Sequence, residues 1–307
     1  MKVLVTGGCG FIGSHIVNRL LEDKYEVIVL DNLSAGKREN ITDTVKVYTI
    51  DLRSPDVDEL FKKENPEIVI HLAAQVDVNK SIQQPLEDAD INILGTVNLL
   101  ECAKRHDIKR FIFASSCAVY GDSSGEITGE EYKTNPISPY GLTKYTSERY
   151  IYIFNEIHQL PYTIFRFANI YGPKQNPTGE AGVIPIFIRR ILSNQAVHIY
   201  GDGTQQREFL YVKDVAEAII KAIEHGNDET YNLGTAHPIT INHLLKELRS
   251  ITNKRITAIH DEPRAGDIKS SRLNSEKAKE QLNWVPIYTL EEGLKETIHY
   301  FTKLDKG

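Results

Sequence analysis

The chain is poor in cysteine and has no long apolar run. Cys9, Cys102 and Cys117 are its three cysteines in 307 residues, an odd number at wide spacing. This spacing argues against a disulfide framework and a cysteine-rich metal site, and it indicates reduced thiols in the cytoplasm. Every apolar run falls short of the ~18 residues that a transmembrane helix needs, so the sequence predicts no membrane span.

A large excess of charge of either sign is also lacking. The formal net charge is −6, and the ten histidines show no metal-ligand spacing such as H-E-x-x-H. A weakly acidic chain has no electrostatic attraction for nucleic acid or an anionic membrane, so we expect neither as a partner, and no metal. Hydrophobic residues make up 41% of the chain, which is enough for the core of a globular protein.

The first half of the chain alternates short apolar runs with helical patterns. Because strands that alternate with helices form a parallel sheet covered on both faces, we expect an α/β fold with a Rossmann-type, doubly wound parallel sheet. The predicted strands are Lys2–Thr6, Glu26–Leu30, Val45–Ile50, Ile68–His71, Phe111–Ala114 and Tyr162–Phe165, and the predicted helices are Phe11–Glu22, Pro55–Lys63, Leu86–Arg105 and Tyr140–His158.

After about Asn169 this alternation gives way to the pattern of a smaller α+β lobe. The segment from Gly172 to Gly182 is rich in proline, glycine and polar residues, and Gly201 to Thr204 is typical of a turn. We assign residues 1–168, with roughly 209–232, to the sheet-forming domain, and residues 169–208 and 233–307 to the lobe. The helices predicted in this half are Gly182–Asn194, Val212–His225, Ile241–Asn253 and Leu290–Thr302.

A glycine-rich loop follows the first predicted strand. Gly7, Gly10 and Gly13 recur every third residue around the start of the predicted helix Phe11–Glu22. A pyrophosphate needs a close approach to the backbone, which a Cβ would block, and a helix N-terminus favours its negative charge. The second predicted strand ends in Asp31, near the spacing expected of a carboxylate that binds ribose hydroxyls and repels a 2′-phosphate. The pattern predicts a dinucleotide cofactor, NAD rather than NADP.

Tyr140 and Lys144 lie four residues apart in a predicted helix, so both face the same side. A phenol with a pKa of about 10 is a weak base at neutral pH, and a neighbouring ammonium stabilises its anion. Ser115 and Ser116 follow the fifth predicted strand, where a hydroxyl can bind a reacting alcohol and relay its proton to Tyr140. Lys144 can also hold the nicotinamide ribose. These residues predict oxidation of an alcohol beside NAD.

Short motifs run in order along nearly the whole chain. In the first half they are Thr6–Ser14, Asp31-Asn32-Leu33, Asp51-Leu52, His71–Ala74, Asn92-x-x-Gly95-Thr96, Ser116-x-x-x-Tyr120-Gly121 and Tyr140-x-x-x-Lys144; in the second half they are Arg166–Pro173, Gly201–Arg207 and Arg264–Asp267. In these motifs the chain resembles the extended short-chain dehydrogenase/reductase superfamily and, within it, the UDP-hexose 4-epimerases. The resemblance implies an isomerase of galactose metabolism that interconverts UDP-glucose and UDP-galactose by transient oxidation at C4, with tightly bound NAD.

The resemblance also implies roles for individual residues. Tyr140 would be the catalytic base, Ser116 its partner, and Lys144 the group that tunes its pKa. Two guanidiniums from separate loops, Arg207 and Arg264, could bind a diphosphate. The implied cofactor-binding residues are Gly7, Gly10, Phe11, Ile12, Gly13, Asp31, Asn32, Asp51, Leu52, Leu72, Ala73, Ala74, Asn92, Ser115, Tyr140 and Lys144; the implied substrate-binding residues are Ser116, Tyr140, Asn169, Val183, Tyr200, Arg207, Arg264, Asp267 and Ser271.

Related enzymes that catalyse other reactions need acids that this chain lacks. The 4,6-dehydratases use an Asp-Glu pair where Cys117 and Ala118 stand, and decarboxylating relatives place a glutamate at Ala118. The alternatives left open are a UDP-uronate 4-epimerase and another NAD-dependent nucleotide-sugar oxidoreductase, such as a ketoreductase. A regulatory protein of the same fold that senses NAD(H) is the alternative without catalysis, and the intact Ser116, Tyr140 and Lys144 argue against it.

Three positions depart from residues expected in some epimerases. Val76 stands where some carry a cofactor-contacting lysine, and Gly182 where some carry a sugar-contacting asparagine. Ser271 stands where epimerases restricted to UDP-glucose and UDP-galactose carry a tyrosine. Because the smaller side chain leaves room beside C2 of the sugar, we expect UDP-N-acetylglucosamine and UDP-N-acetylgalactosamine as further substrates.

The predicted helices Leu86–Arg105 and Tyr140–His158 are long and carry apolar faces. Relatives pair these helices across a two-fold axis as a four-helix bundle. We therefore expect a homodimer.

Overall fold

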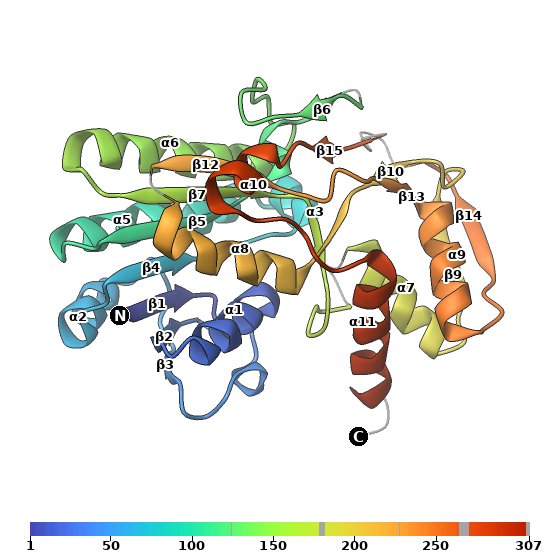
Figure 1. The fold of residues 1–307 in the computed structure, drawn as a ribbon, viewed down its shortest axis with the longest axis horizontal. Coiled ribbons are helices and arrows are strands. Elements are labelled where there is room, and N and C mark those ends of the chain that lie inside the picture. The colour runs from blue at the N-terminus through green and yellow to red at the C-terminus, as the bar shows by residue number, and fades with distance from the viewer. Residues whose placement is uncertain (124, 178–181, 227, 264–269, 305–307) are drawn as a thin grey trace.

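A parallel sheet of seven strands forms the larger part of the molecule, and shorter strands and helices lie at one end of it (Figure 1). The computed structural model describes residues 1–123, 125–177, 182–226, 228–263 and 270–304. The strand order is β12-β7-β5-β4-β1-β2-β3, and every neighbouring pair is parallel. The strands are β1 (Lys2–Thr6), β2 (Glu26–Leu30), β3 (Lys46–Tyr48), β4 (Ile68–His71), β5 (Arg110–Ser116), β7 (Tyr162–Phe167) and β12 (Glu229–Leu233).

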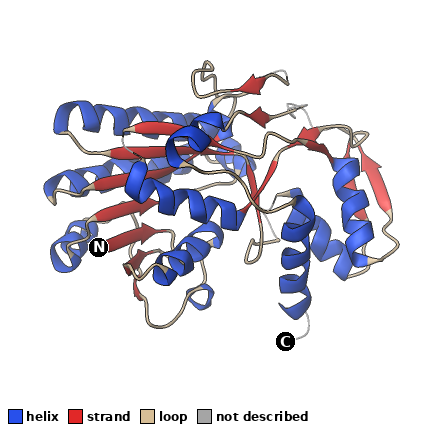
Figure 2. Ribbon diagram, viewed as in Figure 1, coloured by secondary structure: helices blue, strands red, loops and turns tan. Residues whose placement is uncertain are grey.

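Helices cover both faces of this sheet (Figure 2), because successive residues of a buried strand point to opposite sides. In β1, Val3 and Val5 pack into one core with helices α1 and α8, whereas Leu4 packs into another with α2, α5 and α6. The predicted fold class, a doubly wound Rossmann-type sheet, is confirmed. The helices are α1 (Phe11–Glu22), α2 (Asp56–Glu64), α5 (Gly95–Arg105), α6 (Pro139–His158) and α8 (Val212–His225).

The predicted helix Leu86–Arg105 is confirmed as an unbroken helical stretch, but the sequence did not predict the π-helical turn within it. It consists of α4 (Pro85–Ala89), a π-helical turn over Asp90–Leu94, and α5. The N–H of Gly95 donates to the carbonyl of Asp90, five residues earlier. The carbonyl oxygen of Asn92 accepts hydrogen bonds from the hydroxyls of Thr96 and Ser147, at 2.6 and 3.0 Å. These buried side-chain bonds lie at the turn where the backbone departs from the regular helical pattern.

The strand β12 and the short helix α3 (Val78–Gln83) are further elements that the sequence did not predict. The predicted strands Val45–Ile50, Phe111–Ala114 and Tyr162–Phe165 differ from β3, β5 and β7 only at their ends. Such end differences are expected, because pairing rather than apolar composition decides where a strand stops.

The second half of the chain builds its own core and also returns to the large sheet. Residues of α7, α9 and α11 form this core with β9 and β11. Helix α8 packs on α1, and Trp284 is buried in the same core as α1 and α8. The elements are β8 (Asn169–Tyr171), α7 (Val183–Leu192), β9 (Val197–Tyr200), β10 (Gln206–Arg207), β11 (Phe209–Tyr211), β13 (Ile239–Thr240), α9 (Ile241–Thr252), β14 (Ala258–Asp261), β15 (Arg272–Leu273), α10 (Glu276–Leu282) and α11 (Leu290–Leu304), with β6 (Ile127–Thr128) paired to β15.

Across the described residues, no helix combines the length and the apolar character needed to cross a membrane.

Candidate cofactor and active site

The glycine loop between β1 and α1 leaves no room for a side chain at Gly7 or Gly13. A Cβ at Gly7 would lie 2.8 Å from the backbone nitrogen of Ala73, and one at Gly13 would lie 2.1 Å from the carbonyl oxygen of Gly7. Gly7 also has a φ of +69°, a conformation that favours glycine. Gly10 is the N-cap of α1 and supplies no side chain to the amides of the first turn. The loop therefore has the open backbone and the helix N-terminus that suit the pyrophosphate of NAD.

Asp31 lies beside this loop at the end of β2. Its Oδ2 accepts the N–H of Cys9 at 3.0 Å, and its Oδ1 accepts the N–H of Leu33 at 2.8 Å. Burial raises the pKa of this carboxyl, and the two backbone hydrogen bonds oppose the shift. Since each carboxylate oxygen can accept a second hydrogen bond, Asp31 is fixed in place and can still bind ribose hydroxyls.

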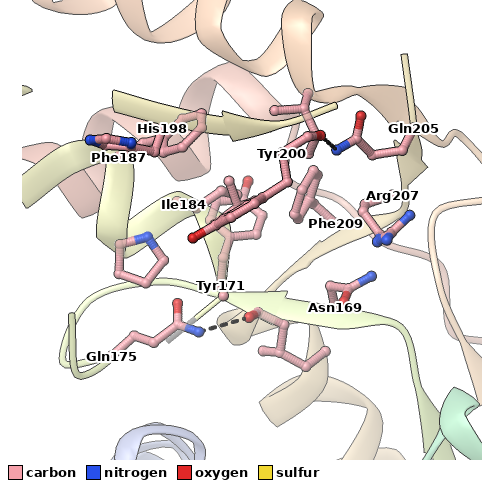
Figure 3. A pocket seen from close by; sticks show the side chains of 15 residues that line it. Asn169, Tyr171, Gln175, Ile184, Phe187, His198, Tyr200, Gln205, Arg207 and Phe209 are labelled. Atoms are coloured by element: carbon pink, nitrogen blue, oxygen red, sulfur yellow. Dashed lines mark hydrogen bonds between the residues drawn. The ribbon is translucent and has the colours of Figure 1, made fainter. Parts of the chain in front are cut away.

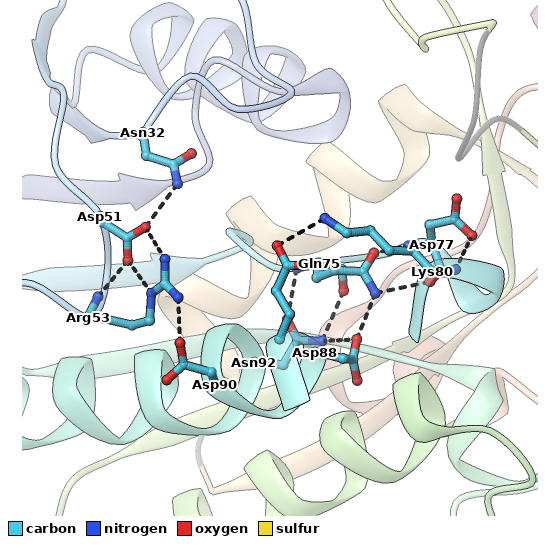
Figure 4. Close-up of polar contacts among 10 residues, drawn as sticks. Asn32, Asp51, Arg53, Gln75, Asp77, Lys80, Asp88, Asp90 and Asn92 are labelled. Atoms are coloured by element: carbon cyan, nitrogen blue, oxygen red, sulfur yellow. Dashed lines mark hydrogen bonds and ion pairs between the residues drawn. The ribbon is translucent and has the colours of Figure 1, made fainter. Parts of the chain in front are cut away.

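Asp51 and Asn32 belong to a chain of polar contacts that ends on the π-helical turn (Figure 4). Asp51 accepts hydrogen bonds from Nε of Arg53 at 2.7 Å and from Nδ2 of Asn32 at 3.2 Å. The Arg53 guanidinium holds the pKa of Asp51 well below its usual range, and it also pairs with Asp90. Leu52, the next predicted cofactor residue, is buried beneath Gly95. These contacts join two predicted cofactor residues to the turn that contains Asn92.

The segment Leu72–Ala74, which follows β4, packs directly on the glycine loop. Oγ1 of Thr6 accepts the N–H groups of Leu72 and Ala73, both at 3.2 Å. Asn92 holds the continuation of this segment, because its Oδ1 accepts the N–H of Gln75 at 2.8 Å and its Nδ2 donates to the carbonyl of Gln75 at 2.9 Å. Asn92 thus fixes the loop that borders the predicted cofactor site.

Helix α6 begins at Pro139, one residue before the predicted start at Tyr140. Oγ of Ser138 accepts the N–H of Gly141 at 3.1 Å, and Pro139 occupies the first helical position. A Cβ at Gly141 would lie 2.6 Å from the carbonyl oxygen of Ala118. The turn that carries Tyr140 is therefore packed against the loop that follows Ser116.

Lys144 is buried one turn further along α6. Its Nζ donates to the carbonyl of Ala114 at 2.8 Å and lies 4.9 Å from the centre of the Phe113 ring. Burial lowers the pKa of Lys144 to about 8, while the negative charges of Asp88 and Glu148 oppose this shift. A lysine held against the end of β5 in this way can support an anion formed at Tyr140.

The two serines at the end of β5 have different partners. Oγ of Ser115 donates to Glu148 at 2.5 Å, and Glu148 forms a buried ion pair with Arg166 at 2.6 Å. Oγ of Ser116 accepts the N–H of Ala118 at 3.1 Å, and its side chain is only half-buried. Ser116 is therefore the hydroxyl of this pair that a substrate can reach, whereas a cofactor contact of Ser115 stays a prediction.

Four predicted substrate residues line one pocket in the second half of the chain (Figure 3). Asn169 comes from β8, Val183 from α7, Tyr200 from β9 and Arg207 from β10. Nδ2 of Asn169 donates to the carbonyl of Glu208 at 3.0 Å, which fixes its amide. The pocket combines a guanidinium, an amide and an aromatic ring, which are groups that suit a phosphorylated nucleoside.

The pocket also contains residues that sequence reasoning missed, among them Gln175, His198 and Gln205 (Figure 3). Nε2 of Gln175 donates to the carbonyl of Ile170 at 3.2 Å, which defines the orientation of the amide. Its Oε1 is buried and has no hydrogen-bond partner in the described part of the chain. A buried acceptor of this kind calls for a donor, which a bound ligand can supply. No motif could have identified Gln175, because its role depends on how its loop folds over the pocket.

The other predicted substrate residues are Ser116 and Tyr140, described above, and Arg264, Asp267 and Ser271. Arg264 and Asp267 lie outside the described residues. Ser271 is half-buried directly before β15, and Oγ of its neighbour Ser270 donates to Oε1 of Gln206 at 3.1 Å. Ser271 is therefore close to the strand that carries Arg207.

Comparison with known proteins agrees with this geometry. Residues 3–234 match the model of the NAD dependent epimerase/dehydratase family. The structure of a UDP-glucose 4-epimerase from Thermotoga maritima, solved with UDP-glucose, is 45% identical, with a TM-score of 0.97 and 99% of each chain covered. A UDP-glucose 4-epimerase from Thermus thermophilus in complex with NAD is 38% identical, with a TM-score of 0.94 and 98% and 99% of the chains covered.

A UDP-N-acetylglucosamine 4-epimerase from Methanobrevibacter ruminantium, in complex with UDP-N-acetylmuramic acid, is 36% identical to the chain. Its TM-score is 0.94, and 99% and 98% of the chains are covered. Both the family match and these similarities extend over the glycine loop, the Tyr140–Lys144 turn and most of the pocket. The chain belongs to the NAD dependent epimerase/dehydratase family.

Proposed function

We propose that the protein is a UDP-hexose 4-epimerase that interconverts UDP-glucose and UDP-galactose with tightly bound NAD. The observation that carries this proposal is the first part of α6, where the turn that contains Tyr140 is packed at Gly141 against the loop after Ser116, and Lys144 is buried one turn further on. The similarity to epimerases over the whole chain supports the choice of reaction.

We also propose that the chain divides into a cofactor-binding domain (1–168 and roughly 209–232) and a nucleotide-sugar lobe (169–208 and 233–307).

The side chains of the site divide the chemistry between them. NAD, when bound in the glycine loop, supplies the acceptor for the hydride from C4 of the sugar. Tyr140 removes the proton of the 4-hydroxyl, Ser116 binds that hydroxyl, and the Lys144 cation stabilises the phenolate. Arg207 binds the diphosphate, so that the oxidised sugar can turn about this anchor and present its other face. Asp31 binds the ribose and disfavours a 2′-phosphate.

The test is turnover of UDP-galactose by purified protein without added cofactor. An epimerase that retains NAD should form UDP-glucose, and the denatured protein should release a nicotinamide nucleotide. A ketoreductase would need an external reductant, and a preference for UDP-glucuronate would favour the uronate epimerase. Absence of turnover with every UDP-sugar would leave the NAD(H)-sensing protein as the better proposal.

We propose that the substrate range includes the N-acetylated sugars, because a serine at position 271 leaves space that a tyrosine would fill. Ser271→Tyr should suppress epimerisation of UDP-N-acetylgalactosamine at least about tenfold while sparing UDP-galactose, since a steric block acts only on the larger C2 substituent. Kinetics with both substrates on both proteins measure this. A wild-type enzyme that leaves UDP-N-acetylgalactosamine untouched would show that the pocket is closed by other groups.

We propose a homodimer formed through the segment Leu86–Arg105, which contains most of α4, the π-helical turn and α5, and through α6. Apolar side chains on these helices are exposed to solvent, among them Leu86 at 87%, Ile153 at 46% and Ile157 at 66%. A second copy of the chain would cover them by pairing the same helices across a two-fold axis. Sedimentation at the mass of two chains would support this arrangement, and a monomer at micromolar concentration would contradict it.

The unpaired cysteines support a reducing, cytoplasmic location.

A further inference from the structure

Asp88 is a buried carboxylate that no step of the proposed mechanism uses. It lies on α4, and only 1% of its surface is exposed. Its Oδ1 accepts hydrogen bonds from Nε2 of Gln75 at 2.7 Å and from Nδ2 of Asn92 at 3.1 Å (Figure 4). Its Oδ2 accepts a hydrogen bond from Oγ1 of Thr143 at 2.9 Å. Burying a carboxylate costs free energy of desolvation, even when three donors from three separate segments bind it. A carboxylate at this buried position therefore points to a specific role for Asp88.

The partners of Asp88 lie on both sides of the reaction centre. Gln75 continues the segment that packs on the glycine loop, and Asn92 belongs to the π-helical turn. Thr143 lies in the first turn of α6, between Tyr140 and Lys144, and its hydroxyl also contacts the carbonyl of Tyr140 at 2.9 Å. Asp88 is thus the group at which the border of the cofactor site and the catalytic turn of α6 are joined.

We propose that Asp88 is a positioning residue: it fixes the Tyr140–Lys144 turn relative to the cofactor loop and supplies negative charge to the surroundings of Lys144. This inference rests on the proposed function. Its geometric part is the link through Thr143. Its electrostatic part is the attraction between the Asp88 carboxylate and the Lys144 ammonium, both of which are buried.

The other charged groups near Lys144 do not replace Asp88. Glu148, on α6, also favours the cation, but it is ion-paired with Arg166. His71, on β4, is fully buried, and burial together with Lys144 lowers its pKa to about 3, so it carries no charge at neutral pH. On β5, the groups that touch Lys144 are the neutral carbonyl of Ala114 and the Phe113 ring. Within the described residues, Asp88 is therefore the carboxylate near Lys144 that forms no ion pair with an arginine or another lysine.

The test is the pH profile of kcat for UDP-galactose. The alkaline limb should report loss of the Lys144 proton, because only the cation stabilises the Tyr140 phenolate. Asp88→Asn keeps the shape but removes the charge, so it should lower kcat and move this limb to lower pH by roughly half a unit to one unit. Asp88→Glu retains the charge and should leave the limb near its wild-type position.

Two further variants separate this role from a merely structural one. Glu64 is a second buried carboxylate, bound by Tyr48, Lys2 and Lys46, and Lys2 begins β1 at the opposite end of the sheet. Glu64→Gln should lower the melting temperature and leave the alkaline limb in place. Thr143→Val removes the hydroxyl but keeps the charge of Asp88, so it should lower kcat about tenfold without moving the limb, and Thr143→Ser should restore kcat.

Each outcome bears on the inference. If the alkaline limb of the kcat profile stays in place in Asp88→Asn, or moves equally far in Glu64→Gln, the inference about Asp88 is overturned. The proposed epimerase activity would still stand. If Asp88→Asn does not fold, an unchanged kcat in Thr143→Val overturns the positioning role. A wild-type protein that does not epimerise UDP-galactose overturns the proposed function, and the inference fails with it.

Discussion

Tyr140→Phe should lower the turnover of UDP-galactose by at least about 10²-fold, the usual scale of general acid–base catalysis. The substitution keeps the ring, which is packed at the start of α6, and removes the oxygen that would take the proton of the sugar 4-hydroxyl. Lys144 would then have no phenolate to stabilise. Steady-state kinetics measure the loss, and equilibrium binding of UDP and NAD should be unchanged, because neither depends on the phenol oxygen for its main contacts.

The control for this variant is Tyr150→Phe. Tyr150 lies on the same helix with 38% of its surface exposed, so the same change there should leave kcat within about twofold of the wild type. Turnover by Tyr140→Phe close to the wild-type rate would remove Tyr140 from the mechanism. Loss of UDP binding together with activity would instead assign the tyrosine to substrate binding.

Gly13→Ala should abolish retention of NAD and destabilise the protein. The added Cβ would lie 2.1 Å from the carbonyl oxygen of Gly7 and 2.8 Å from the Cα of Gly8. Both neighbours are backbone atoms of the loop itself, so no side-chain rotation relieves the clash. We expect a loss of about 1–3 kcal/mol of folding free energy, the usual cost of overpacking, with a fall in NAD affinity of tenfold or more as the loop opens.

The matched control is Gly129→Ala. Among the described residues, no atom lies within 4 Å of a Cβ at Gly129, so the same methyl group should be tolerated there with little change in melting temperature or cofactor content. Thermal unfolding and the nicotinamide released from denatured protein measure both effects. A Gly13→Ala protein that purifies with a full complement of NAD would show that the pyrophosphate does not depend on this close approach.

The large sheet could be predicted because its strands carry a local signal. β1, β2 and β4 are short β-branched runs bounded by polar residues, and their predicted limits agree with the structure. β12 was missed because Glu229–Leu233 contains threonine and asparagine among few apolar residues. Its pairing with β7, rather than its own residue pattern, makes this segment a strand. Its secondary structure therefore depends on tertiary context.

The same distinction applies to the site. The glycine loop and the Tyr140–Lys144 spacing are local patterns with a direct chemical meaning, and they predicted the cofactor and oxidation of an alcohol beside it. The epimerase reaction was predicted from the resemblance to UDP-hexose 4-epimerases. Asp88 and Gln175 depend instead on contacts between distant segments, such as Asp88 with Thr143, 55 residues away. No spacing rule connects such residues before the fold is known. The π-helical turn was missed for this reason too, because hydroxyls from α5 and α6 stabilise it.

The course of the chain has a consequence for how such a protein can be divided. After building β8 to β11, the chain returns to lay α8 on α1 and to add β12 at the edge of the large sheet, and Trp284 then anchors the last part of the chain to the same core. A fragment ending near residue 168 would therefore lack an edge strand and a covering helix. We therefore expect the two proposed lobes to melt in one cooperative transition, and a cut at any single boundary between them would divide elements that share a core.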